Sequence, residues 1–249
     1  MLHPLIILAV GVVAGMVNAI VGSGSLLTFP TLLALGYPAV LANVTNNVGL
    51  LGGSISGAVG YRRELVGQWR RVSLLLVPAI SGGLLGAILL LALPSSVFED
   101  VVPILILVAV GLVLVQPRLA RRRAHRGESR TEAGPVLYAG GFASAVYGGY
   151  FGAAQGVIML ALLGITLDDG VQRLNAAKNV LVGASNAAAA VVFVVSTHIA
   201  WGAAAELLVG STIGGQIGAH VGRRMHPTVL RVIIAVVGVG VAIKLIVTG

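Results

Sequence analysis

The sequence lacks cysteine and has few charged residues, and both shortages limit the kinds of catalytic and metal-binding site that it can form. Without cysteine there are no disulfides, thiol nucleophiles or cysteine-ligated metal sites. Only 8 of the 249 residues are Asp or Glu, which leaves little for acid–base catalysis. The His-Glu-x-x-His, Gly-x-Ser-x-Gly and Gly-x-x-x-x-Gly-Lys motifs of zinc peptidases, serine hydrolases and phosphate-binding loops are also missing. We therefore expect a protein that is not an enzyme and that holds no cofactor and no metal.

Hydrophobic residues dominate what is present. They make up 57% of the chain, with a mean hydropathy of +1.00, and they come in long runs typical of a chain embedded in a lipid bilayer. No Lys or Arg precedes the first run, so we expect no cleavable signal peptide. The net charge of +8 does not indicate a nucleic-acid partner, because the basic residues cluster beside the apolar runs, where they would face anionic lipid.

The apolar runs predict ten helices and one polar linker. A helix needs about 20 apolar residues to cross a bilayer. The expected helices span 4–21, 25–36, 39–60, 71–93, 97–116, 134–151, 155–165, 171–196, 201–221 and 228–247, and the linker spans 117–133. The runs 25–36 and 155–165 are too short to cross comfortably, and each follows a glycine-rich break. Whether these short segments are re-entrant or cross the membrane stays open.

The two halves of the chain repeat. Trp69 and Trp201 are 132 residues apart (201 − 69), and the same offset relates other matching residues. These matches are Asn43 with Asn175, Asn47 with Asn179, and Gly82-Gly83 with Gly214-Gly215. A single offset that links Trp, Asn and Gly pairs predicts a duplication.

The charged loops orient the two repeats in opposite directions. In the first half the loop after the third segment is basic, with four arginines between 62 and 71, and the next loop is acidic. The second half has the reverse order, with no Arg or Lys between Ser196 and Trp201 and three arginines between 223 and 231. The positive-inside rule then places both termini outside and the linker inside.

These patterns together predict the fold class. We expect an all-α polytopic membrane protein with two inverted repeats, each of three full transmembrane helices plus a broken-helix hairpin. The first repeat covers 1–116, a basic cytoplasmic linker covers 117–133, and the second repeat covers 134–249. The sequence leaves the oligomeric state open, including a homo-oligomer.

The glycine-rich breaks are the first candidate for a binding site. They are Gly22-Ser23-Gly24-Ser25 and the stretch from Gly152 to Gly156, which includes Gln155. Non-helical backbone at membrane depth is tolerated only beside protein or a water-filled cavity. A short helix that starts after such a break points free N–H groups and its positive end into the site, which suits an anion. The alternative is a pair of tight turns at the membrane surface.

The helices that follow the short segments begin with polar residues. The first carries Asn43, Thr45, Asn46 and Asn47, and the second carries Asn175, Lys178 and Asn179. Asparagine is costly in lipid, so these side chains must face protein or water, either as solute ligands or as interhelical hydrogen bonds.

Lys178 is the strongest single candidate for a functional residue, because it lies about two turns inside an apolar span. An ionisable group within a membrane is by default a functional-site hypothesis, and a lysine there would attract an anion, or would titrate if it is desolvated. The alternative is a side chain that extends to the cytoplasmic face, with Asp168 and Asp169 as counter-charges.

Two further polar pairs lie on or near the ninth expected helix. Glu206 and His198 could carry protons if transport is coupled, or they could form an interfacial pair. Gln216 and His220 share one face of the same helix and could line the cavity. Glycines that recur every fourth residue, such as Gly49, Gly53 and Gly57, are read as helix packing.

The motifs resemble one family in particular. Asn18-Ala19-Ile20-Val21-Gly22-Ser23-Gly24-Ser25, followed by Phe29-Pro30 and Thr45-Asn46-Asn47, resembles the sulfite exporter TauE/SafE family. Gly148-Gly149-Tyr150-Phe151-Gly152 with Asn175-Ala176-Ala177-Lys178-Asn179 is similar to that family's second motif. The resemblance implies a duplicated bacterial permease of the cytoplasmic membrane for sulfite, sulfonates or related organosulfur or carboxylate anions.

The leading hypothesis is a secondary transporter that moves a small anion by alternating access. No ATPase domain is present to drive it. The predicted solute-binding residues are Asn18, Gly22, Ser23, Gly24, Ser25, Thr45, Asn46, Asn47, Gly152, Gln155, Asn175, Lys178 and Asn179. The alternatives are a membrane-embedded enzyme and a non-transporting scaffold or channel-like subunit.

Overall fold

The computed structural model describes residues 2–123 and 134–221, and within these ranges the chain is helical without strands. The helices are α1 (Leu2–Ile20), α2 (Ser25–Ala34), α3 (Ala39–Gly60), the 3₁₀ helix η1 (Arg62–Leu65), α4 (Trp69–Ala92), α5 (Ser95–Arg123), α6 (Pro135–Tyr150), α7 (Gln155–Thr166), α8 (Val171–Ser196) and α9 (Trp201–Val221). The predicted all-helical class is therefore confirmed for the described residues.

Local residues explain where these helices begin and end. Pro38 lies just before α3 and Pro135 at the first turn of α6, where a missing N–H costs nothing. The backbone is extended at Leu93, as the following proline requires, and α4 ends there. Left-handed glycines follow the ends of α1 and α6, with φ of +88° at Gly22 and +78° at Gly152.

One predicted boundary is wrong. The helix expected at 97–116 runs on to Arg123, so the first seven residues of the expected linker 117–133 are helical. Leu, Ala and Arg favour a helix whether or not lipid surrounds them, so the end of an apolar run does not end the helix. The rest of the linker, and the helix expected at 228–247, lie outside the described residues.

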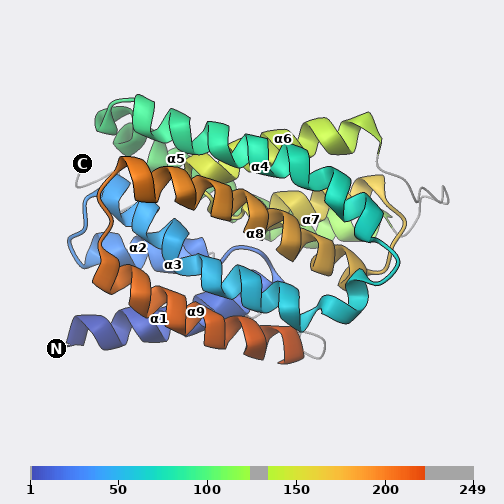
Figure 1. The fold of residues 1–249 in the computed structure, drawn as a ribbon, viewed down its shortest axis with the longest axis horizontal. Helices are drawn as coiled ribbons and strands as arrows, with labels where there is room; N and C mark the ends of the chain where they lie inside the picture. The colour runs from blue at the N-terminus through green and yellow to red at the C-terminus, as the bar shows by residue number, and fades with distance from the viewer. Residues whose placement is uncertain (1, 124–133, 222–249) are drawn as a thin grey trace.

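The helices form two groups that exchange members between the halves of the sequence (Figure 1). Helix α9, from the second half, packs on α1 and α3 of the first. Helix α4, from the first half, packs on α6 and α8 of the second. The two groups meet where α3 crosses α8, and the short helices α2 and α7 lie beside that crossing.

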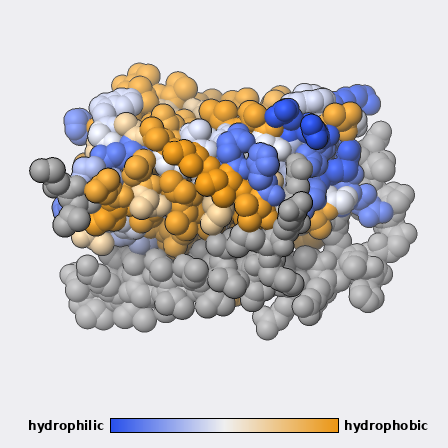
Figure 2. Space-filling view, turned by 90° about the horizontal axis from the view of Figure 1, so that it is seen from below, coloured by the Kyte–Doolittle hydropathy of each residue, from blue (hydrophilic) through white to orange (hydrophobic). Residues whose placement is uncertain are grey.

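The outer surface of the protein is that of a membrane protein. Four of the described helices contain segments long and apolar enough to span a bilayer, namely His3–Ile20, Trp69–Ala92, Ser95–Val115 and Val171–Ser196. Large aliphatic side chains point outward from them, including Val77 (70% exposed) and Val195 (81% exposed). Figure 2 shows hydrophobic residues across the middle of one face and hydrophilic ones gathered most densely at one end. The protein is therefore embedded in the membrane.

Glycines allow the helix backbones to touch, as expected. A Cβ added to Gly149 of α6 would collide with the backbone of Gly83 in α4, and one added to Gly86 would collide with Val146. Helices α1 and α9 meet in the same way, through Gly214 and the backbone of Val12. Small residues at such crossings increase van der Waals contact between helices, which is the main attraction available in lipid.

This packing predicts that alanine will destabilise the protein at one glycine of α6 but not at another. Gly149→Ala should destabilise the protein by about 1–3 kcal/mol, because the new methyl group forces α4 and α6 apart. Gly141→Ala is the control, since a Cβ there would meet nothing within 4 Å. Thermal unfolding of the two purified variants in one detergent measures the difference. Equal melting temperatures would contradict the packing argument.

Candidate solute-binding site at the helix breaks

The two helix breaks are built alike, 130 residues apart (152 − 22). In the first, the Gly22 N–H donates to the carbonyl of Val17 at 3.1 Å, and in the second the Gly152 N–H donates to Tyr147 at 3.2 Å. Each bond spans five residues and closes the end of a helix through a left-handed glycine. The two halves therefore share the backbone geometry at the glycine that follows each of these helices.

The two breaks touch each other in the protein interior. The Gly156 N–H donates to the carbonyl of Gly22 at 3.1 Å. A Cβ on Gly22 would lie 2.6 Å from the Cα of Gly156, so glycine is required for this approach. Ser23 (1% exposed) and Gln155 (0%) are buried beside the contact. Both breaks are therefore packed within the protein and are not solvent-exposed turns.

The expected row of free amides at the start of α7 is also wrong. The N–H groups of Gln155, Gly156 and Val157 donate to the carbonyls of Gly152, Gly22 and Ala154. Ala154 adopts a left-handed conformation with φ of +60°, which turns its carbonyl toward the first turn of the helix. Buried backbone donors are rarely left unpaired, and here the breaks satisfy each other. At the start of α7, side chains must therefore supply the free polar groups.

The carbonyl end of α1 is held by two side chains of α8. The Lys178 Nζ donates to the carbonyls of Asn18 at 2.9 Å and Ala19 at 3.3 Å. The Asn175 Nδ2 donates to the carbonyl of Ala19 at 2.9 Å. A cation is favourable at the C-terminus of a helix, where the macrodipole is negative. The predicted residues Asn18, Asn175 and Lys178 are thus brought together, next to Gly22.

The carbonyl end of α6, before the second break, is bonded in a similar way by a side chain of α3, but that side chain is uncharged. Asn43, the counterpart of Asn175 (175 − 132), donates its Nδ2 to the carbonyl of Tyr150 at 2.9 Å, at the end of α6. The counterpart of Lys178 is Asn46 (178 − 132), whose Oδ1 accepts a short hydrogen bond from Thr28. One repeat therefore carries a cation where the other carries an amide.

Lys178 has no acidic partner among the described residues. It is 1% exposed, and both of its hydrogen bonds in the described structure go to backbone carbonyls. The alternative in which Lys178 extends to the cytoplasmic face is wrong, because the side chain is buried. Asp169 is not its counter-charge, since that carboxylate pairs with Arg71 and Arg173. In its charged form a buried lysine without an anionic partner is costly, which makes Lys178 the residue of the described interior to test first.

Several buried polar atoms around the breaks have no hydrogen-bond partner. Those on predicted site residues are Ser23 Oγ, Asn47 Oδ1, Gln155 Oε1, Asn175 Oδ1 and Asn179 Nδ2. Each unpaired group of this kind costs about 1–3 kcal/mol, so water or a solute is expected to satisfy it. These unpaired groups lie on both breaks and on both α3 and α8, the segments from which the candidate site is predicted.

Two members of this lining are not evident from the breaks alone. Ser144 Oγ on α6 and Asn186 Oδ1 on α8 are buried and unpaired as well. Asn186 follows Asn179 by seven residues, so the two share one face of α8. Its counterpart Ser54 (186 − 132) accepts a hydrogen bond from Asn18 at 3.3 Å. The heptad spacing and the repeat offset are the signals that identify it.

Other predicted residues have structural partners or lie apart. Thr45 Oγ1 accepts the Ala200 N–H at 3.2 Å, and a Cβ on Gly24 would strike the carbonyl of Ala14. Ser25 begins α2. His198 is exposed in the α8–α9 connection and Glu206 is half-buried on α9, and no ion pair between the two is found in the described chain.

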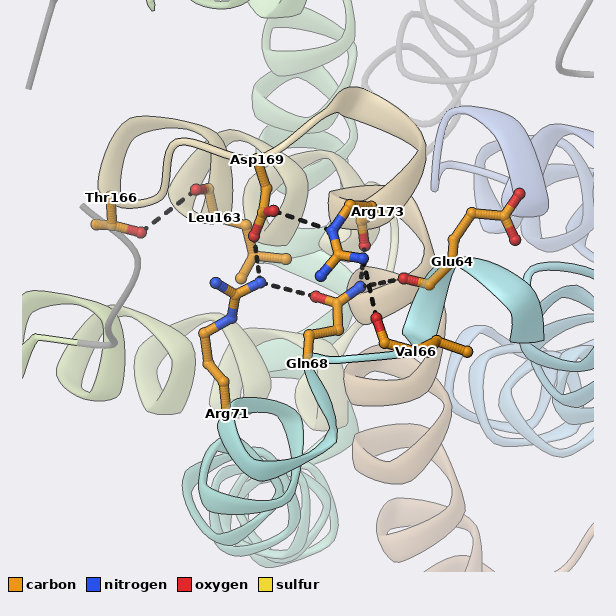
Figure 3. A network of polar contacts seen from close by, with 8 residues as sticks. All are labelled: Glu64, Val66, Gln68, Arg71, Leu163, Thr166, Asp169 and Arg173. Carbon is orange, nitrogen blue, oxygen red and sulfur yellow. Dashed lines mark hydrogen bonds and ion pairs between the residues drawn. The ribbon is translucent and has the colours of Figure 1, made fainter. Parts of the chain in front are cut away.

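A polar latch joins the two halves at one end of the molecule (Figure 3). Asp169, between α7 and α8, pairs with Arg71 of α4 and with Arg173 at 3.0 Å. Gln68 donates to the carbonyls of Glu64 at 2.7 Å and Arg173 at 3.0 Å, and it accepts a bond from Arg71. Arg173 also donates to the carbonyl of Val66 at 2.9 Å.

The latch holds Asp169 in its charged form. Burial raises the pKa of this carboxyl, but hydrogen bonds and charge attraction from Arg71 and Arg173 outweigh burial, so the pKa is lowered overall. The latch was not predicted as a unit, although its basic loop and Asp169 stood out in the sequence.

Known proteins resemble this chain over nearly its whole length. The model of the family described as sulfite exporter TauE/SafE matches residues 7–245. A "Probable membrane transporter protein" of Haemophilus influenzae is 28% identical, covering 97% of this chain and 93% of its own. "Probable membrane transporter protein YfcA" of Escherichia coli is 28% identical, covering 95% of this chain and 87% of its own. "Probable membrane transporter protein YunE" of Bacillus subtilis is 24% identical, covering 98% and 97%. The chain therefore belongs to the sulfite exporter TauE/SafE family of membrane transporters.

Proposed function

We propose that this protein is a secondary transporter that carries a small anion across the cytoplasmic membrane by alternating access. The solute is a sulfite, a sulfonate or a related organosulfur or carboxylate anion. The observation that carries the proposal is Lys178, a buried lysine with no acidic partner, beside two broken helices lined with unpaired polar groups. The family and the names of the bacterial relatives agree with transport in general.

Charge balance favours an anion over a neutral or cationic solute. The carbonyls of Asn18 and Ala19 offer Lys178 only partial charges, so the ammonium keeps a net positive field inside the protein. A bound anion completes the neutralisation, whereas a cation would add to the repulsion. Ionisable groups within membrane segments are rare for this reason and usually mark a transport path.

Hydrogen-bond donors around Lys178 suit a solute with several oxygen atoms. Ser23 offers a hydroxyl from the first break, and Asn179 offers an unpaired amide from α8. Oxyanions such as sulfite and sulfonate accept several bonds at once, and charge-assisted bonds of this type are stronger than neutral ones. The unpaired oxygens of Asn47, Gln155 and Asn175 can hold ordered water around the solute.

The two repeats supply the symmetry that alternating access requires. Gly57 of α3 lies against Asn179 of α8, while Ser54 lies against Gly183, so the two helices cross in antiparallel directions. This crossing relates equivalent residues of the two halves and supports an inverted repeat of 1–116 and 134–249 about the linker 117–133. With the positive-inside rule, both termini are then outside and the latch faces the cytoplasm.

The latch is the cytoplasmic gate in this proposal. It ties the first turn of α4 and η1 to the start of α8, and so closes one end of the path between the halves. Opening that end requires breaking the Asp169 pairs, while the opposite end has no equivalent arginines between Ser196 and Trp201.

Replacement of Lys178 tests the solute site. In proteoliposomes, Lys178→Gln should lower saturable sulfite or ethanesulfonate flux at least about tenfold, because a buried charge-assisted bond is worth about 1.5–3 kcal/mol. Arg70→Gln removes one positive charge from an exposed residue and should leave flux near wild type. Gel filtration confirms that each variant is folded. Unchanged flux in Lys178→Gln, or no saturable flux of any anion in the wild type, would refute the proposal.

The gate is tested by labelling a buried position from the cytoplasmic side. The chain has no cysteine, so Ser23→Cys is a single reporter that is buried while the latch is closed. Adding Asp169→Asn should speed maleimide labelling in inside-out vesicles about 5–30-fold, corresponding to about 1–2 kcal/mol of lost latch energy. Asp168→Asn is the matched control, because Asp168 is the exposed neighbour with the same charge. Equal labelling in the two variants would argue against a gate here.

The latch should not respond to pH near neutrality. Because the pKa of Asp169 is lowered in the folded protein, its stabilising effect is complete above the ordinary carboxyl pKa of about 4 and is lost only as pH falls further. The labelling rate of Ser23→Cys, corrected for reagent reactivity, should therefore be constant between pH 6 and 8. A rise as the pH drops from 8 to 6 would assign the gate to another group.

A further inference from the structure

A cavity lies between the end of α3 and the end of α9. Its volume is about 170 Å³. The residues that line it are Gly60, Arg62, Arg63, Gln216, Ala219 and His220. Three of these are basic, and none belongs to the solute site described above. Gln216 and His220, which the sequence suggested as lining the transport cavity, lie here instead.

Close packing of α3 and α9 forms this cavity. A Cβ on Gly60 would overlap the side chain of Ala219, so the two helices touch at the base of the cavity. The Gln216 Nε2 donates to the carbonyl of Ser56 at 3.2 Å and fixes the register. The His220 Nδ1 lies 3.0 Å from the carbonyl of Gln216. A carbonyl can only accept, so this nitrogen carries the proton and the ring is held in place.

The two arginines have unused donors. The Arg62 guanidinium donates one bond, to the carbonyl of Val59 at 3.3 Å, and Arg63 makes no hydrogen bond in the described chain. Neither pairs with a carboxylate among the described residues, although Glu64 follows them directly. A guanidinium has five N–H donors in a planar fork that matches the oxygens of a phosphate group. Two such forks beside one cavity favour a phosphate over a monodentate anion.

The repeat does not reproduce this cavity. The counterparts of Arg62 and Arg63 are Val194 and Val195 (62 + 132 and 63 + 132), which are 46% and 81% exposed. A transport site related by the pseudo-symmetry would have polar groups at both positions, as the helix breaks do. The cavity therefore belongs to one face of the membrane only.

Exposed apolar side chains lie next to the cavity on α3 and α9. Ile55 (62% exposed) and Val59 (46%) lie one turn apart on α3, and Ile217 (41%) lies beside Gln216 on α9. A ligand with a phosphate and acyl chains could place the phosphate between the arginines and its chains along these side chains. Free phosphate would use only the polar part of this surface.

We propose that this cavity binds the phosphate group of an anionic phospholipid. Basic pockets between transmembrane helices on the cytoplasmic side suit such headgroups, and the neighbouring aliphatic side chains suit the acyl chains. Binding here fixes the ends of α3 and α9 at the membrane surface. The proposal does not depend on which solute is transported.

Native mass spectrometry of the full-length protein tests the site. With phosphatidylglycerol, Arg63→Gln should bind lipid about 10–100-fold more weakly than wild type, because a hydrogen bond to a charged group is lost. Arg70→Gln is the matched control, since Arg70 is an exposed arginine of the same face that does not line the cavity. It should bind like wild type. Arg63 makes no internal bond, so its replacement is not expected to disturb folding.

Two further arms separate the possible ligands. Phosphatidylcholine tests whether the net negative charge of the lipid matters and should bind weakly. Inorganic phosphate tests the headgroup chemistry alone. Weak binding of inorganic phosphate supports the lipid assignment, whereas tight Arg63-dependent binding would assign the cavity to free phosphate and overturn it. Equal losses in Arg63→Gln and Arg70→Gln would mean nonspecific surface charge and would also overturn the proposal.

Discussion

The contact between the two helix breaks is the constraint on which the rest of the interior depends. Backbone that leaves helical geometry inside a membrane protein must find partners for its N–H and C=O groups. Here the Gly156 N–H donates to the carbonyl of Gly22. Lys178 and Asn175 donate to carbonyls at the end of α1, and Asn43 donates to a carbonyl at the end of α6. These side chains cannot face lipid, because each is committed to a carbonyl of the other half. The broken backbone therefore requires these buried polar side chains as hydrogen-bond partners, whether or not they also bind a solute.

The sequence was sufficient to predict most of the described helices, but not the hydrogen-bond partners of the buried polar residues. Helix boundaries follow from run length, proline and glycine, and they fail at Arg123, where the run ends but helix propensity continues. The exchange of α4 and α9 between halves leaves no local signal, because it depends on which surfaces fit. Similarly, Lys178 stood out by its position, whereas its partners Asn18 and Ala19 lie 160 and 159 residues away.

The two halves of the chain share several backbone features, and the differences between them lie in their charged residues. The left-handed glycines and the asparagine bonds to the carbonyl ends recur in both halves. At the offset of 132 residues, Lys178 corresponds to Asn46, and Arg62 and Arg63 correspond to Val194 and Val195. Lys178, Arg62 and Arg63 are thus each present in one half only. Lys178 lies in the interior, and the two arginines lie at the end of α3. A symmetric fold can in this way hold a single anion and keep a fixed orientation in the membrane.

Helix α8 connects the latch to the solute site. Arg173 lies five residues before Lys178, which is about 7.5 Å along a helix. The same segment therefore carries the Asp169 pair at one end and the bonds to α1 at the other. A helix of this length moves as a rigid body, so a displacement that separates Arg173 from Asp169 and Val66 also shifts Lys178 against the carbonyls of Asn18 and Ala19. Under the alternating-access mechanism proposed above, loss of the latch and loosening of the bonds made by Lys178 are one motion, and that motion would release the anion.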